Sequence, residues 1–142
     1  MEKDKIKEKL KLAFNQFLTN DIYLLKQNTD ERNLTFRLAI YLQQIFNDWN
    51  VDCEYNRNHQ DIKQIKQIDN GNIRPDIIIH HRGTDDNLVI IEAKKTNNNK
   101  DDTDKLKKEK QQLNYKYAYK LTFFVGEKLN KNCFEKCFDE IE

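Results

Sequence analysis

Residues that interrupt helices and strands or cross-link the chain are scarce in this sequence. Its 142 residues include three glycines, one proline and three cysteines. With so few glycines and prolines the chain offers little flexible linker, and we expect a single domain over residues 1–142. An odd number of cysteines in a lysine-rich chain favours a reducing, cytoplasmic compartment over a disulfide scaffold.

Long apolar runs and a large excess of one charge are also absent. No stretch approaches the roughly 18–20 apolar residues that a membrane span needs, and the charged N-terminus lacks the apolar centre of a signal peptide. We therefore expect no membrane partner. The 25 basic and 24 acidic residues leave a net charge of +1, so a nucleic-acid-binding surface requires local segregation of charge.

The most informative stretch of the chain runs from Arg74 to Thr96. Apolar runs at 77–79 and 88–91 flank a polar loop at 82–87. Runs this short, rich in Ile and bounded by turn-forming residues, are typical of the two strands of a β-hairpin. The loop places the turn of the hairpin near residues 84 and 85, and the open end of the hairpin near residue 76.

Charged side chains gather at this open end. The turn position places Asp76 opposite the segment Glu92–Lys94. Because side chains alternate along a strand, Glu92 and Lys94 share a face, which Asp76 can join at roughly 5 Å across the ladder. Two carboxylates this close repel each other, and a divalent cation such as Mg2+ relieves the repulsion because it takes oxygen ligands. The alternative is a Glu92–Lys94 ion pair at the sheet margin, worth about 0–1 kcal/mol, which leaves the second acid unexplained.

The pattern of Pro75-Asp76, fifteen intervening residues and Glu92-Ala93-Lys94 resembles the signature of the PD-(D/E)XK nuclease superfamily. The resemblance covers about residues 29–126. It implies a restriction-endonuclease-like core, which is an α/β fold with a central mixed β-sheet flanked by helices. The expected order of elements in this chain, helix, strand, hairpin, helix and strand, agrees with that core.

The resemblance also implies a function. The chain would be a metal-dependent nuclease that hydrolyses phosphodiester bonds, of DNA before RNA, as an endonuclease or an exonuclease. Asp76 and Glu92 would hold Mg2+ or Mn2+ together with the Ala93 carbonyl, and the ion would lower the pKa of bound water and polarise the phosphate. Lys94 would orient the attacking water or neutralise charge that develops on the phosphate.

A further acidic residue, Glu31, lies on the helix that precedes the first strand. An apolar stripe at helical spacing predicts this helix from about residue 30 to residue 47 or 49. Asn28 can cap it, with Glu31 at the third helical position as in a capping box. Many members of the superfamily carry a Glu on this helix, so the resemblance makes Glu31 a candidate catalytic and metal-binding residue as well. The two roles are compatible, and the sequence leaves both open.

The other periodic segments complete the expected order of elements. They are a helix at 3–18, a short helix at 21–26, a strand at 51–55, a helix from 102 or 103 to about 120, a strand at 121–125 and a helix at 130–142. A turn at Asp69-Asn70-Gly71 interrupts the polar segment 56–74. We expect one nuclease-like domain with a helical extension at 1–28, a core at 29–126 and a C-terminal helix at 127–142.

Lysines are concentrated just after the candidate site. Residues 94–120 hold nine lysines against four acidic residues, which indicates either salt-sensitive affinity for phosphates or a merely solvated helix. Gln111 and Tyr115 match the spacing of a helical pair found in exonuclease-like branches of the superfamily. His80 and His81 are expected to be structural or surface residues, and Cys133 and Cys137 are expected to be ordinary core residues.

Two other interpretations of the same residues stay open. The chain can be a catalytically silent nucleic-acid-binding or assembly module of this fold, although the intact Asp76, Glu92 and Lys94 argue against that. It can also be the nuclease subunit of a larger restriction or repair system, because no target-recognition domain is evident in the sequence. A homodimer or a larger complex would then supply specificity and a second active site.

Overall fold

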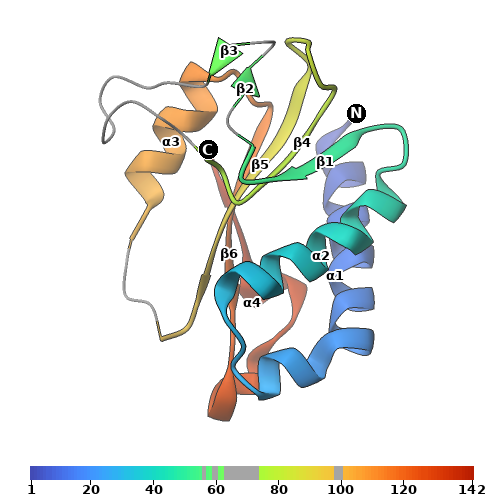
Figure 1. The fold of residues 1–142 in the computed structure, drawn as a ribbon, viewed down its shortest axis with the longest axis vertical. Coiled ribbons are helices and arrows are strands. Elements are labelled where there is room, and N and C mark those ends of the chain that lie inside the picture. The colour runs from blue at the N-terminus through green and yellow to red at the C-terminus, as the bar shows by residue number, and fades with distance from the viewer. Residues whose placement is uncertain (56, 59–60, 63–73, 98–100) are drawn as a thin grey trace.

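The structure is a computed structural model, and it describes residues 1–55, 57–58, 61–62, 74–97 and 101–142 (Figure 1). Its elements in chain order are α1 (Lys3–Lys26), α2 (Glu31–Ile45), β1 (Asn50–Cys53), β2 (Arg57–Asn58), β3 (Asp61–Ile62), β4 (Ile77–His80), β5 (Asn87–Lys95), α3 (Thr103–Gln112), β6 (Tyr117–Phe123), a 3-10 helix (Gly126–Lys131), α4 (Phe134–Cys137) and β7 (Phe138–Ile141). The predicted turn at 69–71 lies outside the described residues.

A five-stranded mixed sheet forms the centre of the molecule, with the strand order β1-β4-β5-β6-β7. Strands β5 and β6 are parallel and are connected through α3, whereas the other neighbouring pairs are antiparallel. The short strands β2 and β3 pair separately. The predicted α/β class, a central mixed sheet flanked by helices, is therefore confirmed.

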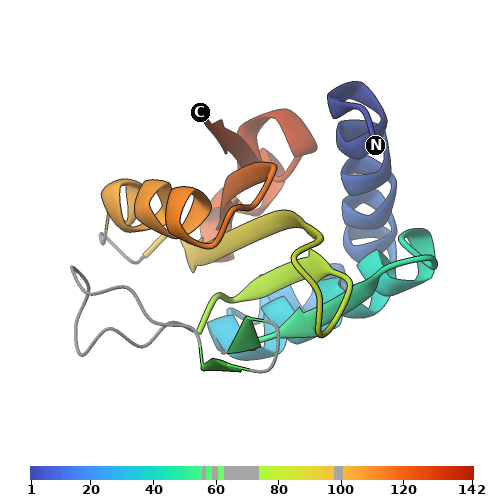
Figure 2. The ribbon, with the colours of Figure 1, turned by 90° about the horizontal axis from the view of Figure 1, so that it is seen from above.

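Helices cover both faces of the sheet. Helices α1 and α2 pack on one face and α3 packs on the other (Figures 1 and 2). Ile77, Ile79 and Ile91 join the core beneath α1 and α2, whereas Ile78 and Ile90 join the core beneath α3. A strand buried on both faces has no polar side, which explains the continuous apolar runs of β4 and β5.

The register of the β4–β5 hairpin agrees with the prediction. Ile77 pairs with Ile91 and Ile78 pairs with Ile90, and a bulge near His80 adjusts the turn. One step beyond the last pair, the same register sets Asp76 opposite Glu92. The hydrophobic runs alone are enough to define this pairing, because a slip by one residue would exchange the two faces of each strand.

Helix α1 extends further than the predicted segment 3–18. It continues to Lys26 and includes the short helix predicted at 21–26, across a kink at Asp21 (φ −122°, ψ 19°). Asp21 is buried there and accepts hydrogen bonds from Arg37 Nε at 3.1 Å and from the Tyr41 hydroxyl at 2.8 Å. These contacts from α2 offset the loss of helical geometry at the kink.

Helix α3 is shorter than the predicted segment ending near residue 120. It ends at Gln112, and Asn114 has a left-handed conformation (φ 59°). Asn tolerates this conformation well and commonly follows the end of a helix. Tyr117 and Ala118, which the sequence placed on the helix, therefore lie in β6, an aromatic-rich strand that also includes most of the segment predicted at 121–125.

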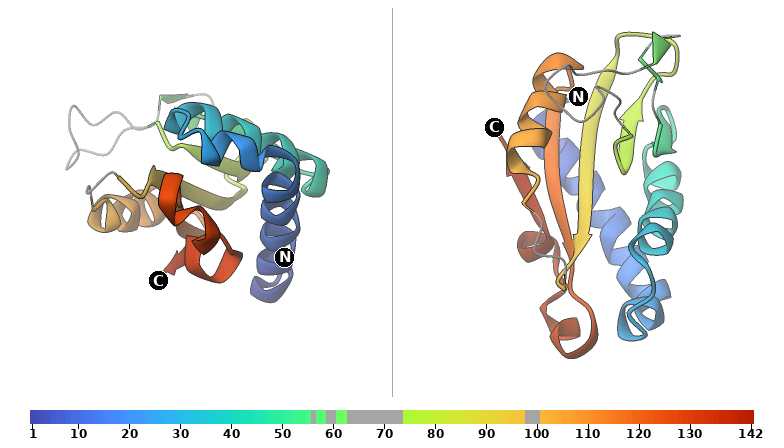
Figure 3. Two further views of the ribbon diagram at one scale, coloured as in Figure 1. Left: turned by 90° about the horizontal axis from the view of Figure 1, so that it is seen from below. Right: turned by 60° about the vertical axis from the view of Figure 1, so that its left-hand side comes forward.

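The predicted C-terminal helix at 130–142 is wrong. The segment instead forms a 3-10 helix, the single helical turn α4 and the strand β7, which pairs with β6 at the edge of the sheet (Figure 3). Phe138 and Ile141 of β7 are buried. The ring of Phe138 packs edge-on against the ring of Phe14 of α1, with 5.2 Å between the ring centroids. Pairing with the open edge of β6 outweighs the local preference for a helix, since an unpaired edge leaves backbone groups unsatisfied.

None of the helices in the described part of the chain is both long and apolar enough to cross a membrane.

The Asp21 contacts yield a stability prediction. Asp21→Asn removes the charge that faces Arg37 and weakens the hydrogen bonds from Arg37 and Tyr41. We expect a loss of about 1–3 kcal/mol in the free energy of unfolding, as for a buried polar group left partly unsatisfied. Urea unfolding measures the effect. Glu8→Gln, on an exposed position of the same helix, should change the value by less than about 0.5 kcal/mol, and equal midpoints for the two variants would contradict the role of Asp21.

Candidate active site

The open end of the β4–β5 hairpin is closed by a side chain rather than by the backbone ladder. The Ala93 N–H donates a hydrogen bond of 2.7 Å to Asp76 Oδ2. Pro75, which is buried, precedes Asp76 and has no N–H that would need a partner. Asp76 is therefore fixed at the beginning of β4, with its carboxylate directed across to β5.

The carboxyl groups of Asp76 and Glu92 meet at this position. Glu92 is only 8% exposed, and burial raises its pKa well above the usual range, with further contributions from the negative charges of Asp76 and Glu109. Burial also raises the pKa of Asp76, against the stabilising hydrogen bond from the Ala93 amide. The interaction between the two carboxyl groups lowers the pKa of Asp76 and raises that of Glu92. The predicted convergence of these two acids is present in the fold.

Helix α3 adds two residues to the site that the sequence did not single out. Glu109 is completely buried, and burial raises its pKa to about 7 even though the nearby Lys105 lowers it. Within the described part of the chain, both carboxyl oxygens of Glu109 and Oε1 of Glu92 lack a hydrogen-bond partner other than the carboxyl groups of these two acids themselves. Burial lowers the pKa of the half-buried Lys105, but the charges of Glu92 and Glu109 outweigh this effect and raise it overall.

The position of Glu109 was available from the helical pattern. Leu106, Glu109 and Leu113 follow one another at intervals of three and four residues, so they lie on the same face of α3. Leu106 and Leu113 pack against the sheet, and Glu109 must accompany them. The sequence argument had counted Glu109 only as a negative charge among the lysines of this segment.

Lys94 lies two residues beyond Glu92 on β5, on the same face. It lines a small hollow between β5, β6 and the start of α3, together with Glu92, Ala93, Asp102, Lys120 and Leu121. Lys120 Nζ is hydrogen-bonded to the Thr103 hydroxyl at 2.9 Å. The hollow therefore combines the acid Glu92 with two lysines, and the catalytic role of Lys94 stays a prediction.

Glu31 approaches the hairpin from the opposite face. The capping box predicted with Asn28 is wrong, because α2 begins at Glu31 and Asp30 caps it by accepting a hydrogen bond of 2.8 Å from the Asn33 N–H. Asn28 has a left-handed conformation (φ 53°) in the connection between α1 and α2. The Glu31 side chain is directed toward β5, where Oε2 accepts a hydrogen bond of 3.3 Å from the Lys95 N–H.

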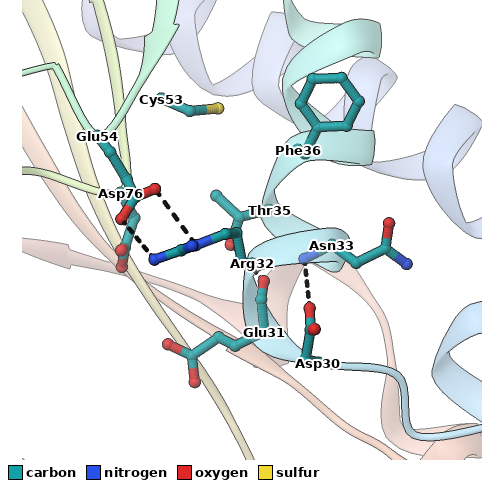
Figure 4. A pocket seen from close by; sticks show the side chains of 9 residues that line it. All are labelled: Asp30, Glu31, Arg32, Asn33, Thr35, Phe36, Cys53, Glu54 and Asp76. Atoms are coloured by element: carbon teal, nitrogen blue, oxygen red, sulfur yellow. Dashed lines mark hydrogen bonds and ion pairs between the residues drawn. The ribbon is translucent and has the colours of Figure 1, made fainter.

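A cavity of about 590 Å³ lies between the start of α2, the last residue of β1 and Asp76, which immediately precedes β4 (Figure 4). Glu31 and Asp76 both line it, and the ion pair between Arg32 and Glu54, at 3.3 Å, crosses its wall. Phe36 lies at the same cavity with its ring largely exposed. Asp76 thus borders this cavity on the α2 side and contacts Glu92, which faces α3.

The histidines contribute to packing at the other end of the hairpin. His80 Nε2 lies 2.7 Å from the Asp52 carboxylate, which Arg82 also binds. The ring of His81 stacks on the ring of Trp49, with 4.0 Å between the ring centroids. His80 is buried and His81 is partly exposed, which agrees with the prediction that they are structural or surface residues.

The Gln111 and Tyr115 pair does not form on one helix. Gln111 is an exposed residue of α3, whereas Tyr115 is buried beyond the end of that helix. The prediction was wrong because α3 ends before Tyr115. Of the two cysteines, Cys137 is buried in the core and Cys133 is half-buried.

In the described residues, no group of three or more His, Cys, Asp or Glu side chains is arranged to hold a metal ion. This finding restricts any cation site to fewer protein ligands of these types. Mg2+ is often bound through one or two carboxylates and completes its shell with water and phosphate oxygens. The Asp76 and Glu92 pair meets that smaller requirement.

Comparisons of the chain with protein-family models, with curated proteins and with solved structures returned no match. The resemblance to the PD-(D/E)XK superfamily therefore depends on the motif residues and on their arrangement at the open end of the hairpin.

The buried carboxyl of Glu109 makes stability depend on pH. Its pKa is near 7 in the folded chain and near the ordinary value of 4.5 in the unfolded chain, so the folded state binds more protons between these values and loses stability as pH rises through them. Glu109→Gln removes this pH-dependent contribution to the free energy of unfolding. We expect the variant to gain about 2–3 kcal/mol relative to the wild type between pH 5 and pH 8, measured by urea unfolding with chelator present.

Asp104→Asn, on the exposed side of the same helix, provides the control and should leave the pH dependence unchanged. Parallel stability curves for the wild type and Glu109→Gln would show that Glu109 is ionised and satisfied in the folded chain, contrary to the account above.

Proposed function

We propose that this protein is a metal-dependent nuclease that hydrolyses phosphodiester bonds, with DNA preferred over RNA. The observation that carries the proposal is the contact between the Asp76 and Glu92 carboxyl groups at the open end of the hairpin, with Lys94 on the Glu92 face. The order α2-β1-β4-β5-α3-β6, with β5 and β6 parallel, supports it as well. This order agrees with the restriction-endonuclease-like core that the motif resemblance implies.

The chemistry of the two acids fits a divalent cation. Glu92 has a buried carboxyl oxygen without a hydrogen-bond partner among the described residues, and its pKa is raised by burial and by the charge of Asp76. A cation would satisfy that oxygen and relieve the repulsion between the two acids. Asp76, Glu92 and the Ala93 carbonyl would hold Mg2+ or Mn2+, which supplies activation of water and polarisation of the scissile phosphate when bound.

The residues of the chain then have separate tasks. The hydrogen bond from the Ala93 amide holds the Asp76 carboxylate in one orientation, which is the preorganisation that a catalytic site requires. The Lys94 ammonium orients the attacking water or neutralises charge on the phosphate. Glu31 supplies a carboxylate on the α2 side, beside the cavity that Asp76 also lines.

Affinity for nucleic acid comes from the lysines near the site. Lys107 and Lys108 are exposed on α3, and Lys120 lines the hollow beside Lys94. Contacts of this kind with phosphates release counterions and give binding that weakens as salt increases. One site per chain cuts one strand, so cleavage of a duplex would use a homodimer or a partner in a larger restriction or repair complex.

The burial of Glu92 favours a second candidate function. At 8% exposure, this carboxyl has little contact with the solvent from which a metal ion and the attacking water would come. A catalytically silent module of the same fold, which binds nucleic acid or assembles with a partner, would retain the lysine surface without needing access to Glu92.

Cleavage assays separate these two functions. The full chain is incubated with plasmid, single-stranded DNA and RNA, with Mg2+ or Mn2+ and with chelator. Asp76→Ala, Glu92→Ala and Lys94→Ala should each reduce metal-dependent cleavage by at least about 100-fold, because each removes a ligand or a charge from the reacting centre. Circular dichroism checks that each variant remains folded.

Asp139→Ala, on an exposed position of β7, is the matched control and should cleave like the wild type. Cleavage that survives in all three site variants rejects the assignment. Binding of DNA by the wild type without cleavage under either metal would support the silent module instead.

A further inference from the structure

Glu109 has an environment that the proposed reaction does not explain. Its side chain is completely buried between α3 and the sheet, and within the described residues its carboxyl oxygens have no hydrogen-bond partner apart from the neighbouring acid Glu92. Buried polar groups in folded proteins are nearly always hydrogen-bonded, and a buried carboxylate without a partner costs several kcal/mol. Such a group is expected to have a ligand that the protein atoms alone do not provide.

Glu92 presents a third unsatisfied oxygen to the same region. Its Oε1 is buried without a hydrogen-bond partner in the part of the chain described, and the charges of Glu92 and Glu109 act on each other. Lys105, one helical turn before Glu109, acts on both acids through its charge but does not hydrogen-bond the unsatisfied oxygens. Three buried oxygens from two acids therefore lie in one region without an N–H or hydroxyl donor among the described residues.

A divalent cation satisfies this arrangement better than a proton does. A proton on Glu109 would be donated to Glu92, its hydrogen-bond partner, and would leave the other carboxyl oxygen of Glu109 without a donor among the described residues. Mg2+ or Mn2+ prefers carboxylate oxygens as ligands and can be held by two carboxylates. Neighbouring catalytic cations are typically about 3.5–4 Å apart, a separation that one shared carboxylate can bridge.

We propose that Glu92 and Glu109 together bind a divalent cation on the α3 face of the sheet, next to the cation held by Asp76 and Glu92. The inference depends on the proposed nuclease function in that Glu92 is shared between the two positions. Glu109 is then a metal ligand of the site. Lys105 neutralises part of the remaining negative charge and faces the same space.

Isothermal titration calorimetry of the full chain with Mn2+ tests the inference. The wild type should bind two Mn2+ ions per chain and Glu109→Gln should bind one, because the amide keeps the size of the side chain but removes its charge. Asp104→Asn, an exposed acid on the same helix, should bind two. Equal stoichiometry and affinity in the wild type and Glu109→Gln would overturn the inference.

A second variant keeps the test decisive if Glu109→Gln does not fold. Glu109→Asp retains the charge but withdraws it from Glu92 by one methylene, so the affinity for the second Mn2+ should fall at least about tenfold. An unchanged affinity in Glu109→Asp would likewise overturn the inference.

Failure of this inference can be distinguished from failure of the proposed function. If Asp76→Asn loses one Mn2+ ion and cleavage while Glu109→Gln binds like the wild type, the nuclease assignment stands and the second cation site is rejected. If Glu109→Gln loses one ion but cleavage survives in the Asp76 and Glu92 variants, the cation site stands and the nuclease assignment is rejected. A wild type that binds no Mn2+ rejects the second cation site directly.

Discussion

The hydrogen bond from the Ala93 N–H to the Asp76 carboxylate is the contact on which the site depends. At 2.7 Å it joins the two strands of the hairpin beyond their last backbone pair. It holds Asp76 next to Glu92, although the negative charges of the two acids repel each other. Both side chains are also partly or fully removed from water. This repulsion decides the chemistry of the site, because a positive charge bound between the two carboxylates would relieve it.

The two layers of helices supply acids to this position from opposite faces of the sheet. Helix α2 contributes Glu31, which reaches the end of β5, and α3 contributes Glu109, which lies buried near Glu92. The hairpin between them carries Asp76 and Glu92. A cleft on the α2 side remains accessible beside Asp76, whereas Glu92 is buried on the side of the sheet that faces α3.

The sequence predicted the hairpin, its register and the Asp76–Glu92 contact because these depend on a short-range pattern of Ile and Val within about 20 residues of chain. It failed where long-range pairing decided the outcome. The terminal segment became β7 because β6 needed a partner at its edge, a requirement that no local pattern contains. Glu109 was overlooked for a different reason. Its spacing from Leu106 and Leu113 places it on the apolar face of α3, but it was counted only as a charge, and the face that carries its side chain was not considered.

Crystals of the protein grown with Mn2+ and measured for anomalous scattering would test the central claim most directly. The account predicts an anomalous peak roughly 2.1 Å from carboxylate oxygens of both Asp76 and Glu92, with the Ala93 amide still bonded to Asp76. A structure in which the Asp76 carboxylate points away from Glu92, or in which Mn2+ binds elsewhere and leaves this pair unoccupied, would contradict it.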